Sequence, residues 1–443
     1  MISAADNELL VRVGRATPMG KFMQQFWIPA CRSSELVADA PPMRLMLLGE
    51  KLIAFRDTAG RTGIFDHRCP HRCASLFFGR NEQHGIRCVY HGWKFDVDGN
   101  CLDQPNLPDK NKYPAGMKAI AYKTAEQGGL VYVYMGESQS APPPLPQIEA
   151  LTAEPNDKNN ALIHRECNWL QALEGDVDTS HLAFLHAGCV DAERMDPGDT
   201  HTYLVKNKTP EIGVSKMPYG TMYAASRDAM EGFDHHRFAH FVFPFWVCYP
   251  SDRFERNMSA NAWVPIDDEN TMIFNVDTQR AAGRQKQMSY ADGTAVPGLA
   301  RPMEYLPQTN DWMGRWRPAR NWKNDYLIDR GMQQRGESYT GVPGIPLQDQ
   351  MIQESMGPIV DRTLEHLGSS DRMVMITRRA LLDAVRDYKE KGILPRVLHE
   401  PGLARLARGG DMLVAKDEGL NWLEAYEKAM TAKYGPGAQV AAE

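Results

Sequence analysis

Two short fragments that each carry one cysteine and one histidine constrain this chain most. The first reads Cys69-Pro-His71, sixteen residues follow, and the second reads Cys88-Val-Tyr-His91. The apolar runs around them are short and are separated by Gly, Asp and Asn, a pattern typical of antiparallel strands. Strands are expected at 45–49, 51–55, 63–66 and 130–134. The sequence therefore predicts a small antiparallel β domain with both fragments at the tips of hairpins.

The donor set of these fragments indicates what they bind. Two thiolates and two imidazoles suit a [2Fe–2S] cluster of the Rieske type, in which two histidines replace two cysteines on one iron. The glycine and aromatic of Gly92-Trp93 fit a tight loop that screens such a cluster from water. Zinc is the alternative, but zinc sites usually pair C-x₂₋₄-C with H-x₃₋₅-H. Each fragment here supplies one cysteine and one histidine, so the sequence favours a cluster held by Cys69, His71, Cys88 and His91.

Length and composition exclude several classes of protein. A chain of 443 residues should hold about two or three domains. The formal charge of −6 without a basic stripe speaks against nucleic acid as a partner. The longest strongly apolar run, 241–250, is shorter than the about 20 residues that span a bilayer, and the N-terminus lacks the pattern of a signal peptide. Eight cysteines, two of them assigned to iron, indicate a reducing compartment, so a cytoplasmic protein without a membrane partner is expected.

Four segments of different character follow one another along the chain. We expect an N-terminal segment at 1–40 that packs on the catalytic domain, the cluster domain at 41–140, a proline-rich linker at 141–160 and a catalytic domain at 161–443. In the last, apolar spacing predicts a helix at 168–174, strands at 200–206, 221–225, 237–249 and 272–276, and helices beyond residue 346, notably 372–385. A long surface loop is expected at 282–302. The fold class is α+β, with an antiparallel sheet covered by helices in the larger domain.

A second set of metal-binding residue types opens the catalytic domain. Asp178, His181 and His186 stand close together in the sequence, and two histidines with a carboxylate form the facial triad of non-haem Fe(II) oxygenases. On a straight α-helix two positions five apart point about 140° away from each other. The two histidines can therefore share one iron only if the helix ends or distorts between them. Asp178, three residues before His181, is expected to orient that imidazole instead of binding the metal.

Taken together, these motifs resemble a known family. Cys69-x-His71…Cys88-x₂-His91, the proline-rich linker and Glu174-x₃-Asp178-x₂-His181-x₄-His186 are similar to the α subunit of Rieske non-haem iron ring-hydroxylating oxygenases. The runs 168–181 and 353–371 are most similar to the phthalate dioxygenase branch. The resemblance implies that the carboxylate of the triad lies far downstream, at the start of a helix. Asp349, in the first turn after Pro346, fits best, with Asp361 and then Glu354 as alternatives.

The resemblance also implies an assembly and a reaction. These α subunits form head-to-tail homotrimers or stacked trimers, in which His91 of one subunit would meet Asp178 of the next, and Asp178 in turn contacts His181. The reaction implied is the use of O₂ to convert an aromatic ring into a cis-dihydrodiol. Because the sequence has no G-x-G-x-x-G and no P-loop, electrons from NADH must come through a separate flavin and [2Fe–2S] reductase.

The substrate expected from this branch is an aromatic carboxylate, which calls for a cation in an apolar pocket. Four basic residues lie on segments expected to line that pocket, with Lys208 and Arg237 as the main candidates beside Lys206 and Arg227. The resemblance implies an arginine near the first of these segments in phthalate-type enzymes, but this chain has Lys206 and Lys208 there, and lysine cannot make the bidentate clamp of arginine. This departure argues against ortho-phthalate and leaves isophthalate, a halobenzoate and a phenoxybenzoate as equal alternatives. The residues Asp234, His235, His236 and His240 have metal-like spacing but are expected to be structural.

Other functions remain open at this point. A monooxygenase or O-demethylase of the same architecture would use the same ligands. A Rieske electron carrier would need only the first domain, so the about 300 residues beyond it argue against that class. A ligand sensor with a degenerate iron site is disfavoured because all expected ligands are present.

Overall fold

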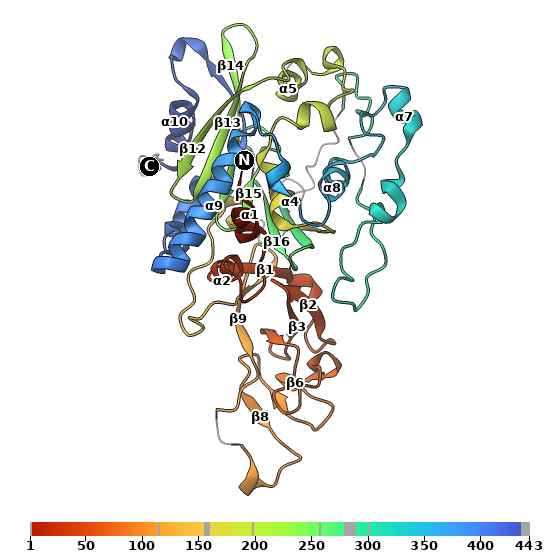
Figure 1. The fold of residues 1–443 in the computed structure, drawn as a ribbon, viewed down its shortest axis with the longest axis vertical. Helices are drawn as coiled ribbons and strands as arrows, with labels where there is room; N and C mark the ends of the chain where they lie inside the picture. Colours follow the sequence, from red (N-terminus) through yellow and green to blue (C-terminus); the bar gives the residue numbers. More distant parts are fainter. Residues whose placement is uncertain are drawn as a thin grey trace.

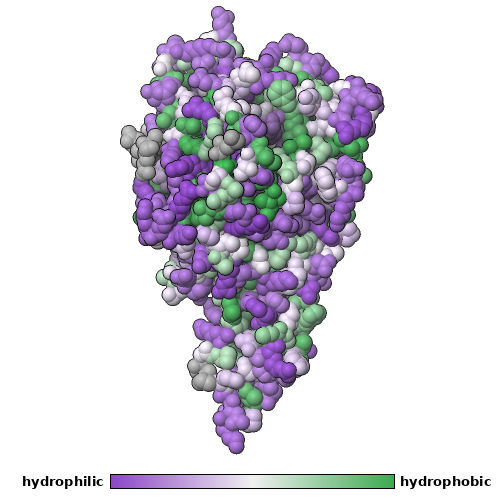
Figure 2. Space-filling model, viewed as in Figure 1, coloured by the Kyte–Doolittle hydropathy of each residue, from purple (hydrophilic) through white to green (hydrophobic). Residues whose placement is uncertain are grey.

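The computed structural model describes residues 2–113, 116–154, 160–196, 199–256, 258–278, 289–299 and 302–435. The molecule is elongated, with a wide body built on a large sheet and a narrow end that carries β6 and β8 (Figure 1). On the same face the narrow end is mostly hydrophilic, whereas larger hydrophobic areas lie on the body (Figure 2). Residues 282–288, 300 and 301 of the expected loop at 282–302 and residues 155–159 of the expected linker lie outside the described residues.

Two antiparallel sheets form the narrow part. The larger has the strand order β1-β10-β9-β4-β3-β2 and the smaller β5-β6-β7-β8. Strand bounds in the larger sheet are β1 Trp27–Arg32, β2 Met43–Leu47, β3 Glu50–Arg56, β4 Thr62–Asp66, β9 Ala121–Gln127 and β10 Leu130–Tyr134. Those in the smaller sheet are β5 Arg80–Glu82, β6 Gly85–Arg87, β7 Lys94–Phe95 and β8 Cys101–Asp103. All four strands predicted in this region are present, within about two residues of their expected ends.

An eight-stranded antiparallel sheet forms the body. Its order is β11-β17-β16-β15-β14-β13-β12, with β18 paired to β14. The strands are β11 Ala161–Arg165, β12 Glu211–Met217, β13 Gly220–Asp228, β14 Phe233–Val242, β15 Trp246–Cys248, β16 Ser259–Pro265, β17 Thr271–Asp277 and β18 Gly410–Ala415. The predicted α+β class, with a small antiparallel domain and a larger helix-covered sheet, is confirmed.

Helices cover this sheet and connect it to the rest of the chain. The long α9 packs on β12 and β13, and α4 packs against β14 to β16 (Figure 1). The helices of the described residues are α1 Ala4–Val11, α2 Pro18–Gln24, α3 Glu149–Thr152, α4 Trp169–Val177, α5 His201–Lys206, α7 Arg330–Gln334, α8 Ile345–Ser355, α9 Arg372–Lys391 and α10 Trp422–Tyr434. The helices predicted at 168–174 and 372–385 correspond to α4 and α9.

Two predicted strands were wrong. The segment 200–206 is not a strand but the helix α5, because Asp199 accepts the backbone N–H of His201 and Leu204 packs against Ala183 and Ala187. The segment 237–249 is not one strand: β14 ends at Val242, and a turn containing Pro244 separates it from β15. Proline has no N–H to donate to a sheet, so it marks the break.

The first residues of the chain connect the two parts. Helices α1 and α2 contact α9 of the body, whereas β1 pairs with β10 in the sheet of the narrow part. One large apolar core runs through this junction and includes Phe22, Trp27, Tyr132 and Trp169. A separate smaller core, with Phe55, Phe65, Trp93 and both Cys69 and Cys88, lies under the cluster loops.

A buried ionic cluster fixes the helix that leads to the second metal motif. Glu174 on α4 accepts hydrogen bonds from Arg362 and from Arg378 on α9, and Arg378 also pairs with Glu365. Burial alone would raise the pKa of Glu174, but the two guanidinium groups outweigh it and lower that pKa. Glu174, the first residue of the motif that continues to His186, is therefore a structural residue that holds α4 against α9.

Replacement of Glu174 by glutamine should destabilise the protein strongly. Without the carboxylate, two buried guanidinium groups lose their counter-charge, and we expect a loss of about 3–5 kcal/mol in the free energy of unfolding. Asp383→Asn is the matched control, because Asp383 forms an exposed i,i+4 pair with Arg379 on the same α9 and should cost less than about 0.5 kcal/mol. Urea unfolding measures both, and equal losses in the two variants would contradict the structural role of Glu174.

Candidate metal centres

Two tight loops at the narrow end hold the cysteine and histidine fragments. Cys69 follows β4, and its N–H and C=O bond to Ala74 and Cys73; Cys88 follows β6, and its N–H and C=O bond to Trp93 and Gly92. Both thiols are buried, at 1% and 4% exposure, whereas His71 and His91 are partly exposed. The two imidazoles lie face to edge with ring centroids 4.5 Å apart. The loops thus place the cysteines inward and the histidines toward the surface.

The residues after Cys88 close this site. Trp93 stacks on the His71 ring at 4.6 Å with an interplanar angle of 6°, and its Nε1 donates to Asn106. Gly92 has φ +81, and a Cβ there would lie 2.6 Å from Cγ of Pro105. Any other residue would be strained at that φ and would collide with Pro105, in the segment after β8. The Gly-Trp pair therefore permits the tight turn and covers one side of the site.

The donors present fit a [2Fe–2S] cluster. Nδ1 of His91 is buried and has no hydrogen-bond partner among the described residues, so its lone pair is available to a metal. Burial, together with the adjacent Cys88, raises the pKa of the Cys69 thiol to about 12, so metal binding must displace that proton. Each loop supplies one cysteine and one histidine, and two thiolates with two imidazoles are the donor set of a Rieske-type cluster.

The second candidate centre depends on a π-helical turn. The helix α4 ends at Val177, and after Asp178 the chain forms the π-helix η4, Leu182–His186. The N–H of Ala187 donates to the C=O of Leu182 at 2.9 Å, an i→i+5 bond that widens the turn. Positions five apart therefore return to the same side. The distortion that the His181–His186 spacing requires is present, and the two ring centroids lie 5.1 Å apart.

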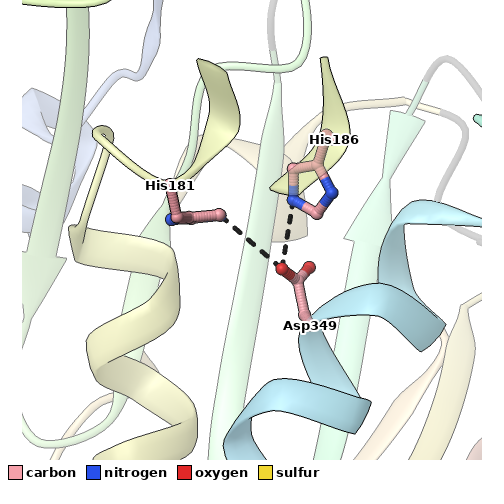
Figure 3. A group of neighbouring side chains, drawn as sticks. All are labelled: His181, His186 and Asp349. Carbon is pink, nitrogen blue, oxygen red and sulfur yellow. Dashed lines mark ion pairs between the residues drawn. The ribbon is translucent and has the colours of Figure 1, made fainter. Parts of the chain in front are cut away.

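A carboxylate from a distant helix completes this group. Asp349 lies on α8, and its Oδ1 is 3.1 Å from Nε2 of His186 and 3.6 Å from Nε2 of His181. Figure 3 shows both imidazoles directed at this carboxylate from the segment after α4. Because α8 begins at Ile345, Asp349 is its fifth residue and opens the second turn, not the first as predicted. One ligand atom from each of these three residues lies within 4.8 Å of the other two. Among the described residues, no other set of three or more His, Cys, Asp or Glu side chains is grouped in this way.

The partners of each histidine fix which ring nitrogen faces the group. Nδ1 of His181 donates to Oδ2 of Asp178 at 3.0 Å, so its Nε2 carries the lone pair. Nδ1 of His186 lies 2.7 Å from Oε1 of Gln348. Nε2 of Gln348 donates to the carbonyls of Val342 and Gly298, which fixes the orientation of the amide and makes His186 Nδ1 the donor. Both histidines therefore present Nε2 as an acceptor toward one point, as metal ligands do.

Electrostatics around the group also fit a cation. Burial would raise the pKa of Asp349, but His186 and His181 outweigh it and lower the pKa to about 2, so the ligand carboxylate is ionised. A second carboxylate, Asp176 on α4, accepts hydrogen bonds from Asn261 and Trp263, and burial raises its pKa to about 6. Two histidines, one ionised carboxylate and open positions are the donor set of a mononuclear Fe(II) centre.

Sequence reasoning missed Gln348 and Asp176. Gln348 directly precedes Asp349, but a glutamine in a helix carries no signal of metal support. The alternatives to Asp349 lie elsewhere: Asp361 is exposed and caps Thr363, and Glu354 bonds to Glu166, Gln350 and Tyr326. The histidines with metal-like spacing have separate partners: His235 bonds to Asp411, His236 to Ser226, and His240 to Tyr219 and Arg408.

The four basic residues considered for substrate binding lie in different surroundings. Lys206 is on the helix α5, not on a strand, and pairs with Glu193 at the surface. Lys208 follows α5 in a loop, also not on a strand, with its Nζ 4.9 Å from the centre of the Phe184 ring of η4. Arg237 on β14 is buried and donates to Asp411 and to the carbonyl of Pro250. Arg227 on β13 is buried beside Asn207.

Replacement of Gln348 by alanine should weaken iron binding selectively. Loss of the acceptor frees the His186 ring to rotate, and such supporting partners are worth about 10- to 100-fold in metal affinity. Fe(II) titration of the stripped mononuclear site measures this, and the visible spectrum of the cluster should not change. Gln334→Ala, at an exposed glutamine of α7, is the control. An affinity in Gln348→Ala equal to that of the control would contradict the assignment.

The chain is similar to two families of domains and to known oxygenase subunits. Residues 26–114 match the model of the Rieske [2Fe-2S] domain, and residues 133–395 match the model described as LigXa C-terminal domain like. The chain is 42% identical to the 3-chlorobenzoate-3,4-dioxygenase oxygenase subunit of Comamonas testosteroni, over 97% of this chain and 98% of that protein. It is 35% identical to the phthalate 4,5-dioxygenase oxygenase subunit of Pseudomonas putida, over 88% of this chain and 87% of that protein.

A solved structure shares the fold. Dicamba monooxygenase bound to dicamba superimposes with a TM-score of 0.54 at 15% identity, over 83% of this chain and 99% of that chain. Within the described residues, no helix is both long and apolar enough to cross a bilayer.

Proposed function

The chain belongs to the Rieske non-haem iron ring-hydroxylating oxygenases, as an oxygenase subunit of the phthalate dioxygenase branch, and we propose that it cis-dihydroxylates an aromatic carboxylate. The observation that carries this proposal is the convergence of His181, His186 and Asp349 on one point, in a chain that also holds a Cys/His cluster site. Oxygenase subunits work with a separate electron-transfer protein, and O₂ is the second substrate. We propose a flavin and [2Fe–2S] reductase fed by NADH, which places the reaction in the cytoplasm.

The residues divide into two sets of ligands and one orienting group. Cys69, His71, Cys88 and His91 would hold the cluster, and His181, His186 and Asp349 would hold the mononuclear iron. When bound, the cluster would supply single electrons and the mononuclear iron would activate O₂. Asp178 keeps the His181 ring in place through Nδ1 and accepts the backbone N–H groups of Ser180 and His181. The half-buried Asp349 stays ionised and so would complete a site of low net charge with a divalent ion.

The substrate class is proposed from the relatives and from basic residues of the catalytic domain. The two relatives are named for 3-chlorobenzoate and phthalate, both of which carry a ring carboxylate. A carboxylate needs a cation when it leaves water. Lys208, which lies over Phe184 of the iron-ligand segment, and Arg237 are candidates for it. The proposed substrates are a halobenzoate, a phthalate isomer or a phenoxybenzoate.

An assembly of subunits would join the two centres. The strand β6, which leads into the Cys88–His91 loop, lies at the narrow end, far along the molecule from α4 and α8 (Figure 1). His91 and Asp178 are both partly exposed, each with a side able to meet a neighbour. We therefore propose a head-to-tail homotrimer, alone or stacked in pairs, in which His91 of one subunit contacts Asp178 of the next.

Asp178→Asn should abolish most turnover and leave both metals bound. The amide keeps the size of the side chain but loses the charge that holds His181 and would accept from His91 across the interface, so we expect activity to fall about 100-fold or more. Iron content and product formation are measured together. Asp383→Asn, at the exposed pair with Arg379 on α9, controls for the loss of a carboxylate. Full activity in Asp178→Asn would contradict the proposed bridge.

The reaction itself is tested by product analysis. The iron-loaded protein is incubated with reductase, NADH, O₂ and a panel of benzoates, phthalates, phenoxybenzoates and methoxyarenes, and the products are identified by mass. A gain of two oxygens and two hydrogens on a carboxylate is expected, and Asp349→Ala should give none. Singly hydroxylated or demethylated products would assign a monooxygenase of the same architecture instead.

A further inference from the structure

One buried arginine of the catalytic sheet, Arg227, forms no ion pair with any residue that the structure describes. Arg227 on β13 is 3% exposed, and its Nε donates to the carbonyl of Asn207 at 2.9 Å. Its Nη1 and Nη2 are both buried and have no hydrogen-bond partner among the described residues. None of the ion pairs formed within the described chain includes this guanidinium. A buried charge with unpaired donors is costly, so this position calls for an anion.

Neighbouring charges do not supply that anion. The adjacent strand β14 carries Arg237 and His235. In the β13–β14 pairing, Arg227 lies opposite His235, and Ala225 lies opposite Arg237. Asp411 neutralises Arg237 and also accepts from His235, so its carboxylate is already engaged. Asp199 in turn pairs with His201. Among the described residues, Arg227 is therefore left without an ion-pair partner. Burial, reinforced by Arg237, lowers its pKa to about 10 against the opposing effect of Tyr223 and Asp411, so it stays protonated at neutral pH.

The segment that carries the iron ligands lies next to this arginine. Asn207, which accepts from Arg227, directly follows α5, and Leu204 of α5 packs against Ala183 and Ala187 around η4. Lys208, the next residue, lies over the ring of Phe184 in η4. On the other side, α5 contacts β13 itself. Arg227 and the His181–His186 turn are therefore joined through one helix of six residues.

We propose that Arg227 receives the carboxylate of the aromatic substrate, an inference that rests on the proposed function. Its two free Nη groups form the fork that binds a carboxylate with two parallel hydrogen bonds. The other two candidates are less suited: Arg237 already has a carboxylate partner, and Lys208 offers only a point charge. Arg227 thus fixes the orientation of the bound substrate. Lys208 and Arg237 add positive charge nearby but do not bind the carboxylate first.

The test compares charged and neutral ligands of one shape. Calorimetry measures binding of 3-chlorobenzoate and of 3-chlorobenzamide to the holoenzyme, in the wild type, Arg227→Gln, Arg227→Lys and the control Arg379→Gln, which removes an exposed arginine of α9. Arg227→Gln should weaken 3-chlorobenzoate binding about 30-fold or more and the amide less than about threefold. Arg227→Lys should fall between, because lysine keeps the charge and loses the fork. Arg379→Gln should match the wild type.

The outcomes separate this inference from the function on which it rests. If the wild type binds and oxidises an aromatic carboxylate and both Arg227 variants keep its affinity, Arg227 is not the carboxylate receptor. A lower melting temperature with equal losses for acid and amide also overturns the assignment, since it would show a purely structural role. If Arg227→Gln does not fold, Arg227→Lys decides by the same comparison. If the wild type neither binds nor oxidises any carboxylate of the panel, the proposed function fails, and the assignment of Arg227 fails with it.

Discussion

The catalytic half of this protein depends on one departure from α-helical geometry, the π-helical turn between His181 and His186. A regular helix would point these side chains about 140° apart. The i→i+5 bond from Ala187 to Leu182 returns both to one side, opposite the carboxylate of α8. Such turns are rare and often lie at functional sites. Glu174, bound to two arginines, fixes α4 before the turn, and Leu204 of α5 packs against it afterwards.

Charge explains why this group of residues suits a metal ion. Asp349 lies half-buried between two imidazoles, and their proximity lowers the pKa of its carboxyl. Each imidazole is held from behind, His181 by the carboxylate of Asp178 and His186 by the amide of Gln348. The two histidines thus have different electronic support. The one backed by the carboxylate is the stronger donor, and it is also the one that Asp178 would connect to a neighbouring subunit.

The sequence predicted what local spacing encodes and missed what distant contacts decide. The Cys69/His71 and Cys88/His91 loops, the strands that flank them and the need for a distortion after Asp178 all follow from residue order. The helix α5 was predicted as a strand because Thr202, Val205 and their neighbours have β-forming character, and only packing of Leu204 on Ala183 and Ala187 reverses that preference. Gln348 and Arg227 could not be singled out, since their roles depend on partners more than a hundred residues away or on the lack of one within the described residues.

The most direct test of this account is an anomalous difference map at the iron absorption edge from crystals of the iron-loaded protein. The account predicts one peak between the Nε2 atoms of His181 and His186 and the carboxylate of Asp349. It also predicts a pair of closely spaced peaks between the two buried thiols and the two imidazoles of the N-terminal loops. A single peak in those loops, or a mononuclear peak beside Asp361 or Glu354, would contradict it.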